Sequence, residues 1–262
     1  MRKADRKKIT VAITGLNAID SPGPGIAVIR CLKEMNDYNV KIIGLSYESL
    51  EPGIYMKNLV KKTYQIPYPS AGIESLLNRL EYIHYKEKLD LIIPNFDAEL
   101  YNFIKITNKL DSLGIKTVLP TLSQFQERDK INLVKLGEKI GLDVPKDAKI
   151  HSIDKLKTIE DDFEFPMVIK GKYYDATIVH THEQARNAFH KLNAKWGLPV
   201  IVQEFIEGME INIAGLGDGT GKALSIIPMR KMYITDNGKA WAGITLDDKS
   251  LIQITKKFIK AT

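Results

Sequence analysis

The first 120 residues alternate between short apolar runs rich in β-branched residues and longer segments with helical spacing of apolar residues. Apolar runs bounded by helical segments are typical of parallel strands joined by crossover helices. The sequence therefore predicts an α/β domain with a Rossmann-like layout over residues 1–120. The expected strands are 8–16, 40–47, 89–95 and 116–120, and the expected helices are 25–35, 74–88 and 98–114.

The pattern changes after residue 120, and residues 121–262 are predicted to form an α+β region. Helical segments at 131–147 (with the helix stopped by Gly141), 152–162 and 182–196 are interspersed with strands. Thr181 and Gln184 have the spacing of a capping box. Later strands follow one another, which favours an antiparallel sheet. We expect a helical linker and lid over 121–205 and the start of a second sheet over 206–262. The expected strands are 167–172, 175–181, 200–205, 210–216, 223–232 and 239–246, with a turn at Asp236-Asn237-Gly238 before the last.

The distribution of charge along the chain argues against nucleic-acid binding. The net charge is +6, but the basic residues are mostly interleaved with acidic ones, and no basic stripe contains aromatic residues. The excess of positive charge suits an anionic small molecule at least as well. No segment has the length of a membrane helix, and the basic N-terminus leads into a strand pattern, so a cytoplasmic protein without a membrane partner is expected.

The single cysteine, Cys31, excludes an internal disulfide and is typical of a reducing compartment. It lies in the expected helix 25–35, where we predict a buried thiol with a packing role. His180 and His182 alternate at a strand end, but two histidines without a third ligand make a poor metal site.

Several cations are candidates for binding phosphate. Lys170 ends the apolar run 167–169, and Lys130 lies at the start of a predicted helix. ATP needs several cations around its phosphates, so the two lysines together are a stronger signal than either alone. Arg230 and Lys231, after the strand Ser-Ile-Ile-Pro-Met, are candidates for stabilising charge on a transferring phosphoryl group. A solvated strand end is an equally good interpretation of that pair.

Two segments of the first domain follow strands and are candidate ligand contacts. Asp97 and Glu99 come after a buried strand, where ligands gather in open α/β sheets, and their carboxylates could orient an ammonium or hydroxyl group. Capping of the next helix is the alternative role. The loop 14–25 carries three glycines, but their spacing departs from the dinucleotide motif. A structural or substrate-facing loop is favoured over a site for NAD(P).

Taken in order, these segments resemble the ATP-grasp superfamily, in the branch of the carbamoyl-phosphate synthetase large subunit. The resemblance implies a Rossmann-like pre-ATP-grasp domain followed by a partial ATP-grasp domain. It matches Lys130 to the cation at a helix start, and Lys170, in Pro166-Met-Val-Ile-Lys170, to the strand lysine of the family. It also implies an adenine-binding hinge, a ribose-binding acid and a later basic residue. These match Gln203, Glu204, Phe205 and Ile206 for the hinge, Glu210 for the acid, and Arg230 or Lys231 for the base.

Two departures from the family pattern stand out. The glycine-rich flap expected after Lys170 is replaced by a segment that begins with Gly171 and has no further glycine until Gly197. The Glu-x-Asn-like pattern that holds magnesium in the family does not occur before Thr262, so its metal ligands are expected beyond that residue. A shortened or split protein is then expected, with little ATP turnover by these 262 residues alone.

The resemblance implies ATP and Mg²⁺ as cofactors, with a small carboxylate and an amine or ammonia as substrates. The expected reaction activates the carboxylate as an acyl phosphate, which the amine then attacks. A non-catalytic nucleotide-binding or regulatory module is the first alternative, and an NAD(P)-dependent enzyme is the second. Expected protein partners are a second copy of the chain or a separate chain that supplies the C-terminal part.

Overall fold

The computed structural model describes residues 6–19, 21–127, 132–172, 175–235 and 238–262. The chain divides into two compact units, Met1–Phe125 and Gln126–Thr262. It combines a parallel sheet in the first unit with antiparallel sheets in the second. The expectation of a mixed α/β and α+β protein is confirmed at this level.

The first unit is built on a five-stranded parallel sheet with the order β3-β2-β1-β4-β5. The central strands β1 and β2 end in runs of consecutive buried residues, as expected of a sheet that is covered on both faces. They are β1 (Lys7–Ile13), β2 (Tyr38–Ser46), β3 (Lys62–Gln65), β4 (Leu91–Ile93) and β5 (Lys116–Thr117). The helices and 3₁₀ segments of this unit are α1 (Gly25–Lys33), η2 (Pro52–Tyr55), η3 (Pro69–Ala71), α2 (Ile73–Glu87) and α3 (Asp97–Ser112). Helix α4 (Leu122–Glu127) crosses the boundary between the two units.

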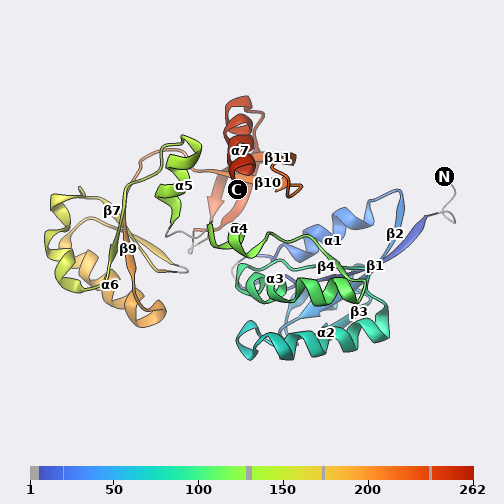
Figure 1. The fold of residues 1–262 in the computed structure, drawn as a ribbon. Helices are drawn as coiled ribbons and strands as arrows, with labels where there is room; N and C mark the ends of the chain where they lie inside the picture. The colour runs from blue at the N-terminus through green and yellow to red at the C-terminus, as the bar shows by residue number, and fades with distance from the viewer. Residues whose placement is uncertain (1–5, 20, 128–131, 173–174, 236–237) are drawn as a thin grey trace. The chain divides into compact units, whose positions relative to one another are not determined.

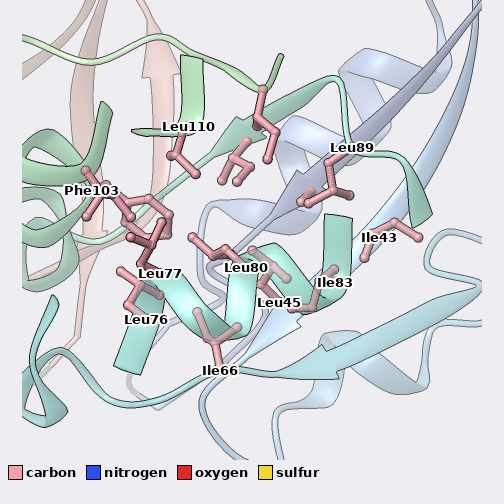
Figure 2. Close-up of a cluster of buried hydrophobic side chains, with 14 residues drawn as sticks. Ile43, Leu45, Ile66, Leu76, Leu77, Leu80, Ile83, Leu89, Phe103 and Leu110 are labelled. Atoms are coloured by element: carbon pink, nitrogen blue, oxygen red, sulfur yellow. The ribbon is translucent and has the colours of Figure 1, made fainter. Parts of the chain in front are cut away.

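Helices cover both faces of this sheet: α1 lies on one side, and α2 and α3 lie on the other (Figure 1). Alternate strand residues therefore enter two separate cores. Ala12, Ile43 and Leu45 pack with Leu80 and Phe103 beneath α2 and α3 (Figure 2). The other core, on the α1 side, contains Val11, Ile13, Leu16, Ile29, Ile42 and Val60.

The second unit contains two antiparallel sheets. The first has the order β6-β9-β7-β8, and the second has the order β10-β11-β12. Their strands are β6 (Asp147–Ile150), β7 (Met167–Lys170), β8 (Ala176–Val179), β9 (Val200–Glu204), β10 (Ile211–Gly217), β11 (Ala223–Ile234) and β12 (Ala240–Thr245). The helices are α5 (Leu133–Ile140), η5 (Ile153–Asp161), α6 (His182–Trp196) and α7 (Lys249–Ala261).

Each sheet of the second unit carries a helix on one face. A core formed by Met167, Ile169, Val179, Val200 and Val202 packs against α6 and η5. Helix α7 contacts β10 and β11, and a side chain on Gly215 or Gly217 would meet Ile259. The face of each sheet that is turned away from its helix is therefore the face on which a ligand could bind.

Several local expectations are confirmed by the helix ends. Thr181 precedes α6 and its hydroxyl accepts a 3.2 Å hydrogen bond from the Gln184 N–H, as its spacing predicts. Gly141 ends α5 with φ of 66°, a left-handed conformation that glycine adopts without strain. Asp236 and Asn237 of the predicted turn lie outside the described residues, but β11 and β12, the strands that they would join, do pair antiparallel.

The prediction that Cys31 is buried is wrong, because its side chain is exposed. Ile29 is the buried apolar residue of α1, and Cys31 follows it by two positions. Two positions correspond to a rotation of about 200° around a helix, which places Cys31 on the opposite side. The helix predicted over 152–162 is also wrong in type, since Ile153–Asp161 forms 3₁₀ turns.

Candidate functional site

One face of the sheet β6-β9-β7-β8 gathers polar residues. Residues directly opposite each other in antiparallel strands project to the same face. Asp147, Gln203 and Val168 are in register across β6, β9 and β7, and so are Lys149, Ile201 and Lys170 in the next row. The alternating residues, such as Met167, Ile169 and Val202, point into the core beneath α6. The polar residues therefore share the face that is turned away from α6.

Lys170 ends β7 on this polar face. It pairs with Ile201 on β9 and with Ala176 on β8, and it is half-buried. The positive charge of Lys170 acts on Asp147. Burial raises the pKa of Asp147, and the charges of Lys149 and Lys170 lower it by a smaller amount, so the pKa is raised overall. The three side chains are thus close enough to interact electrostatically.

The predicted hinge comprises the last two residues of β9 and the two residues that follow. Gln203 is buried, whereas Glu204 and Ile206 are exposed and Phe205 is half-buried. Glu204 is fixed by Lys146: its N–H donates to the Lys146 carbonyl at 2.9 Å, and its carboxylate accepts from the Lys146 N–H at 3.1 Å. The N–H of Ile206 donates to no other residue in the described ranges. This backbone donor is available to a ligand.

The strand register gives the separation between Lys170 and the start of the hinge. Lys170 is opposite Ile201, and Met167 is opposite Glu204. Three residues of strand correspond to about 10 Å. The row of Lys170 is therefore about 10 Å from the row of Glu204, and the free N–H of Ile206 lies two residues beyond Glu204.

On the second sheet, the structure brings together two of the predicted residues, Glu210 and Lys231. The Lys231 ammonium forms an ion pair with the Glu210 carboxylate and donates to the Gly238 carbonyl at 2.9 Å. The Lys231 side chain is only 11% exposed, so its charge is largely removed from water and depends on these partners.

Arg230 and Lys231 project to opposite faces of this sheet. Arg230 is opposite Ile211 on β10, and Ile211 shares its face with Gly215 and Gly217, which lie against α7. Lys231 is the next residue on β11, so its side chain projects away from α7. The sequence could not separate the two candidates, whereas the register places only Lys231 on the side of Glu210.

In the first unit, Glu99 lies at the ends of three parallel strands. Its Oε1 accepts hydrogen bonds from the Thr14 hydroxyl at 2.5 Å and from the N–H groups of Asn95 and Phe96 at 2.7 and 3.0 Å. Its Oε2 accepts the Tyr47 hydroxyl hydrogen. Glu99 is 1% exposed, and burial raises the pKa of its carboxyl despite these donors. The carboxylate acts as a clamp between β1, β2, β4 and the start of α3.

Asp97, the other predicted acid of this unit, is exposed in the first turn of α3. Phe96 precedes the helix, so Asp97 is its first residue. An acidic side chain there is favoured by the partial positive charge of the helix N-terminus. Of the two acids, Asp97 is the one with access to solvent.

The glycine-rich loop between β1 and α1 is closed on itself. The Gly25 N–H donates to the Gly15 carbonyl at 3.0 Å, and the Gly23 N–H donates to the Asn17 carbonyl at 2.8 Å. A Cβ atom on Gly25 would lie 2.1 Å from the Thr14 carbonyl oxygen, so a side chain is excluded at this position. Close packing of the loop against the strand end accounts for this glycine.

Some expected features cannot be placed. Lys130 lies outside the described residues, as do two residues of the segment after Gly171, Tyr173 and Tyr174. Within the described ranges there is no group of three or more His, Cys, Asp or Glu side chains that could hold a metal ion. His182 instead pairs with Glu160 at 2.9 Å.

Two residues on the polar face, Asp147 and Lys149, were not predicted from the sequence. They occupy alternate positions of β6, in the segment Asp-Ala-Lys-Ile. Alternation of this kind is the signal of a half-exposed strand. The strand has only four residues, Asp147–Ile150, which is too short for the alternation to stand out in the sequence.

Ligases are among the known proteins with related sequences. No protein-family model matches the chain. Phosphoribosylamine–glycine ligase of Helicobacter pylori is 22% identical over 194 residues, which cover 71% of this chain and 46% of that protein. The carbamoyl phosphate synthase large chain of Gemmatimonas aurantiaca is 23% identical over 238 residues, which cover 85% of this chain and 20% of that protein.

Solved structures extend the likeness to the fold. The biotin carboxylase domain of the Hydrogenobacter thermophilus 2-oxoglutarate carboxylase, solved with MgADP, ADP and bicarbonate, aligns with a TM-score of 0.65 at 18% identity. The alignment covers 97% of this chain and 58% of that one. The fold is that of the ATP-grasp ligases, over the part of such a protein that this chain spans. The predicted resemblance to that superfamily, including carbamoyl phosphate synthase large chains, is confirmed.

The chain spans about half the length of the first curated relative, and less of the second. None of the helices in the described part of the chain combines the length and the apolar character that crossing a lipid bilayer requires.

Proposed function

We propose that this chain is the nucleotide-binding part of an ATP-dependent ligase that joins a carboxylate to an amine or to ammonia. The observation that supports this best is the arrangement on β7 and β9. Lys170 lies at one end of this strand pair, and Glu204 lies three residues, or about 10 Å, along it. The free N–H of Ile206 follows two residues after Glu204. A backbone donor can pair with the edge of a purine, and an ammonium group can neutralise phosphate.

In this proposal, the adenine lies at Gln203–Ile206 and the phosphates extend toward Lys170, with Lys130 as a second cation. Glu210 binds the ribose hydroxyls, and Lys231, on the same face of its sheet, stabilises charge on the transferring phosphoryl group. Arg230 projects to the other face and is the weaker candidate for that role. Asp97 is the candidate contact for the amine, because Glu99 already accepts four hydrogen bonds.

The proposed reaction has two steps. A carboxylate oxygen attacks the γ-phosphorus of ATP and ADP leaves; the amine nitrogen then attacks the acyl carbon of the acyl phosphate, and phosphate leaves as the nitrogen loses a proton. Mg²⁺, which normally accompanies ATP phosphates, would neutralise charge on them. Because the described residues contain no acidic cluster for a metal, we assign it no protein ligands.

For the first unit, we propose the role of a Rossmann-like pre-ATP-grasp domain, with residues 1–120 as that domain and 121–262 as the ATP-grasp region. The strand order β3-β2-β1-β4-β5 supports the Rossmann-like description. The remaining alternatives make different predictions. A regulatory module would bind ATP or ADP without turnover, and an NAD(P) enzyme would bind the dinucleotide through the loop 14–25.

The proposal is tested by measuring how ligands shift the thermal unfolding of the purified protein. ATP and ADP should raise the melting temperature, because a ligand that binds only the native state stabilises it. Phosphoryl transfer is then tested as carboxylate-dependent release of ADP in the presence of an amine. ADP release that does not depend on any carboxylate would contradict the ligase reaction and leave a nucleotide-binding module.

A further inference from the structure

Lys149 is a basic residue that neither the sequence nor the family resemblance assigns to any role. It lies in β6, in register with Ile201 of β9, and Ile201 is in register with Lys170 of β7. Lys149 and Lys170 are therefore two strands apart in one row, on the face turned away from α6. Two strand spacings amount to about 10 Å between their Cα atoms, which two lysine side chains can bridge toward one anion.

The surroundings of Lys149 leave its ammonium group available. Its side chain is exposed, and it forms no hydrogen bond or ion pair with any other residue in the described ranges. The carboxylate nearest in register is that of Asp147, which senses both Lys149 and Lys170. Two cations beside one carboxylate leave an excess of one positive charge on this face. A polyanion placed there would compensate that charge.

We propose that Lys149 is a further lysine for the phosphates of the bound nucleotide, acting together with Lys170 from the opposite edge of β9. The assignment rests on the proposed nucleotide site and extends it to a residue of β6. Ile201, which is buried between the two lysines, forms an apolar floor that holds both side chains along the face. Asp147 and Gln203 occupy the row toward the hinge. The row proposed to bind the phosphates therefore contains two cations, whereas the row nearer the hinge contains neutral and acidic side chains.

The test is a calorimetric titration of Lys149→Ala with ATP, ADP and AMP, beside the wild type and Lys170→Ala. Lys155→Ala is the matched control, because Lys155 is exposed on η5, which packs on the other face of the sheet. We expect Lys149→Ala to weaken ATP binding by about tenfold or more, the size of one charge-assisted hydrogen bond. The loss should be smaller for AMP, and Lys149→Arg should retain most of the affinity. A purely structural role would weaken all three ligands equally and lower the melting temperature without ligand.

Each other outcome overturns the assignment in a distinguishable way. If the wild type binds ATP and Lys149→Ala binds it as Lys155→Ala does, Lys149 has no role at the phosphates, although the proposed function stands. Equal weakening of ATP, ADP and AMP likewise excludes a role at the phosphates. If the wild type binds none of the three nucleotides, both the proposed function and the role of Lys149 are wrong.

Discussion

Thr14 and Glu99, 85 positions apart in the chain, are joined by a 2.5 Å hydrogen bond from the Thr14 hydroxyl to Glu99 Oε1. The bond connects the end of β1 to the first turn of α3. Together with the bonds from Tyr47, Asn95 and Phe96, it fixes the edge of the sheet at which its strands end. In open α/β sheets this edge faces the ligand, so the clamp sets the shape of any site there.

Glu99→Gln should lower the free energy of unfolding of the protein by about 1–3 kcal/mol, because an amide cannot accept all four hydrogen bonds and leaves a buried donor without a partner. Chemical denaturation monitored by circular dichroism measures this change. Asp97→Asn is the matched control, since Asp97 is exposed in the same turn, and should change stability by less than about 0.5 kcal/mol. Equal effects of the two substitutions would show that Glu99 is not a clamp.

The pH dependence of stability should report on Glu87, which is 5% exposed at the end of α2. Burial raises its pKa, but hydrogen bonds from Lys62, Tyr64 and Lys41 outweigh that effect and lower the pKa from 4.5 to about 2. A carboxyl whose pKa is lowered on folding contributes stability above its unfolded pKa, and loses that contribution as pH falls through the folded pKa. The contribution of Glu87 should therefore be complete above about pH 4.5 and disappear toward pH 2.

The measurement is the difference in unfolding free energy between the wild type and Glu87→Gln as a function of pH. The difference should shrink steadily as the pH is lowered from 4.5 to 2. A difference that stays constant over this range would show that the charge of Glu87 is not stabilised by its lysine neighbours.

Lys170→Ala should weaken ATP binding by about 1.5–3 kcal/mol, the contribution of one hydrogen bond to a charged group. Lys170 is half-buried at the end of β7, so the loss of its charge should weaken the binding of an anionic ligand on the polar face. Calorimetric titration measures the change, with Lys155→Ala as a control for the loss of a positive charge elsewhere. Unchanged ATP affinity in a folded Lys170→Ala protein would remove Lys170 from the site.

Arg230 and Lys231 offer a matched pair of substitutions on adjacent residues. In a form of the protein that turns ATP over, Lys231→Met should lower the rate of phosphoryl transfer by at least tenfold, because Lys231 projects to the same face as Glu210. Arg230→Met removes the same charge from the face that lies toward α7, and should leave the rate within about twofold of the wild type. The reverse ranking, measured by ADP release, would place the catalytic face on the α7 side.

The alternation of elements was readable from the sequence because buried parallel strands leave long apolar runs. The runs at 8–16 and 40–47 correspond to β1 and β2 with boundary shifts of one to three residues. The edge strand β3 was missed, because Lys-Thr-Tyr-Gln is short, polar and only partly buried. The 3₁₀ turns of η5 were read as a helix, since their apolar residues Leu156 and Ile159 have a spacing that both structures allow.

The candidate site was less accessible to sequence reasoning, because it depends on strand register. Lys170 stood out by its place after an apolar run, but its neighbours across the sheet are set by pairing between segments more than 20 residues apart. Lys149 was missed for this reason. The same limitation left Arg230 and Lys231 equivalent in the sequence, although one residue of offset sends them to opposite faces.

The most direct test of the central claim is a comparison of ATP, ADP and NAD(H) as ligands of the same protein preparation. At a concentration of one hundred times its dissociation constant, a ligand stabilises the native state by about 2.7 kcal/mol, which is readily seen as a shift of the melting temperature. ATP and ADP should each raise the melting temperature of the wild type, and Lys170→Ala should reduce that shift. Stabilisation by NAD(H) but not by ATP or ADP would contradict the account and transfer the nucleotide site to the first unit.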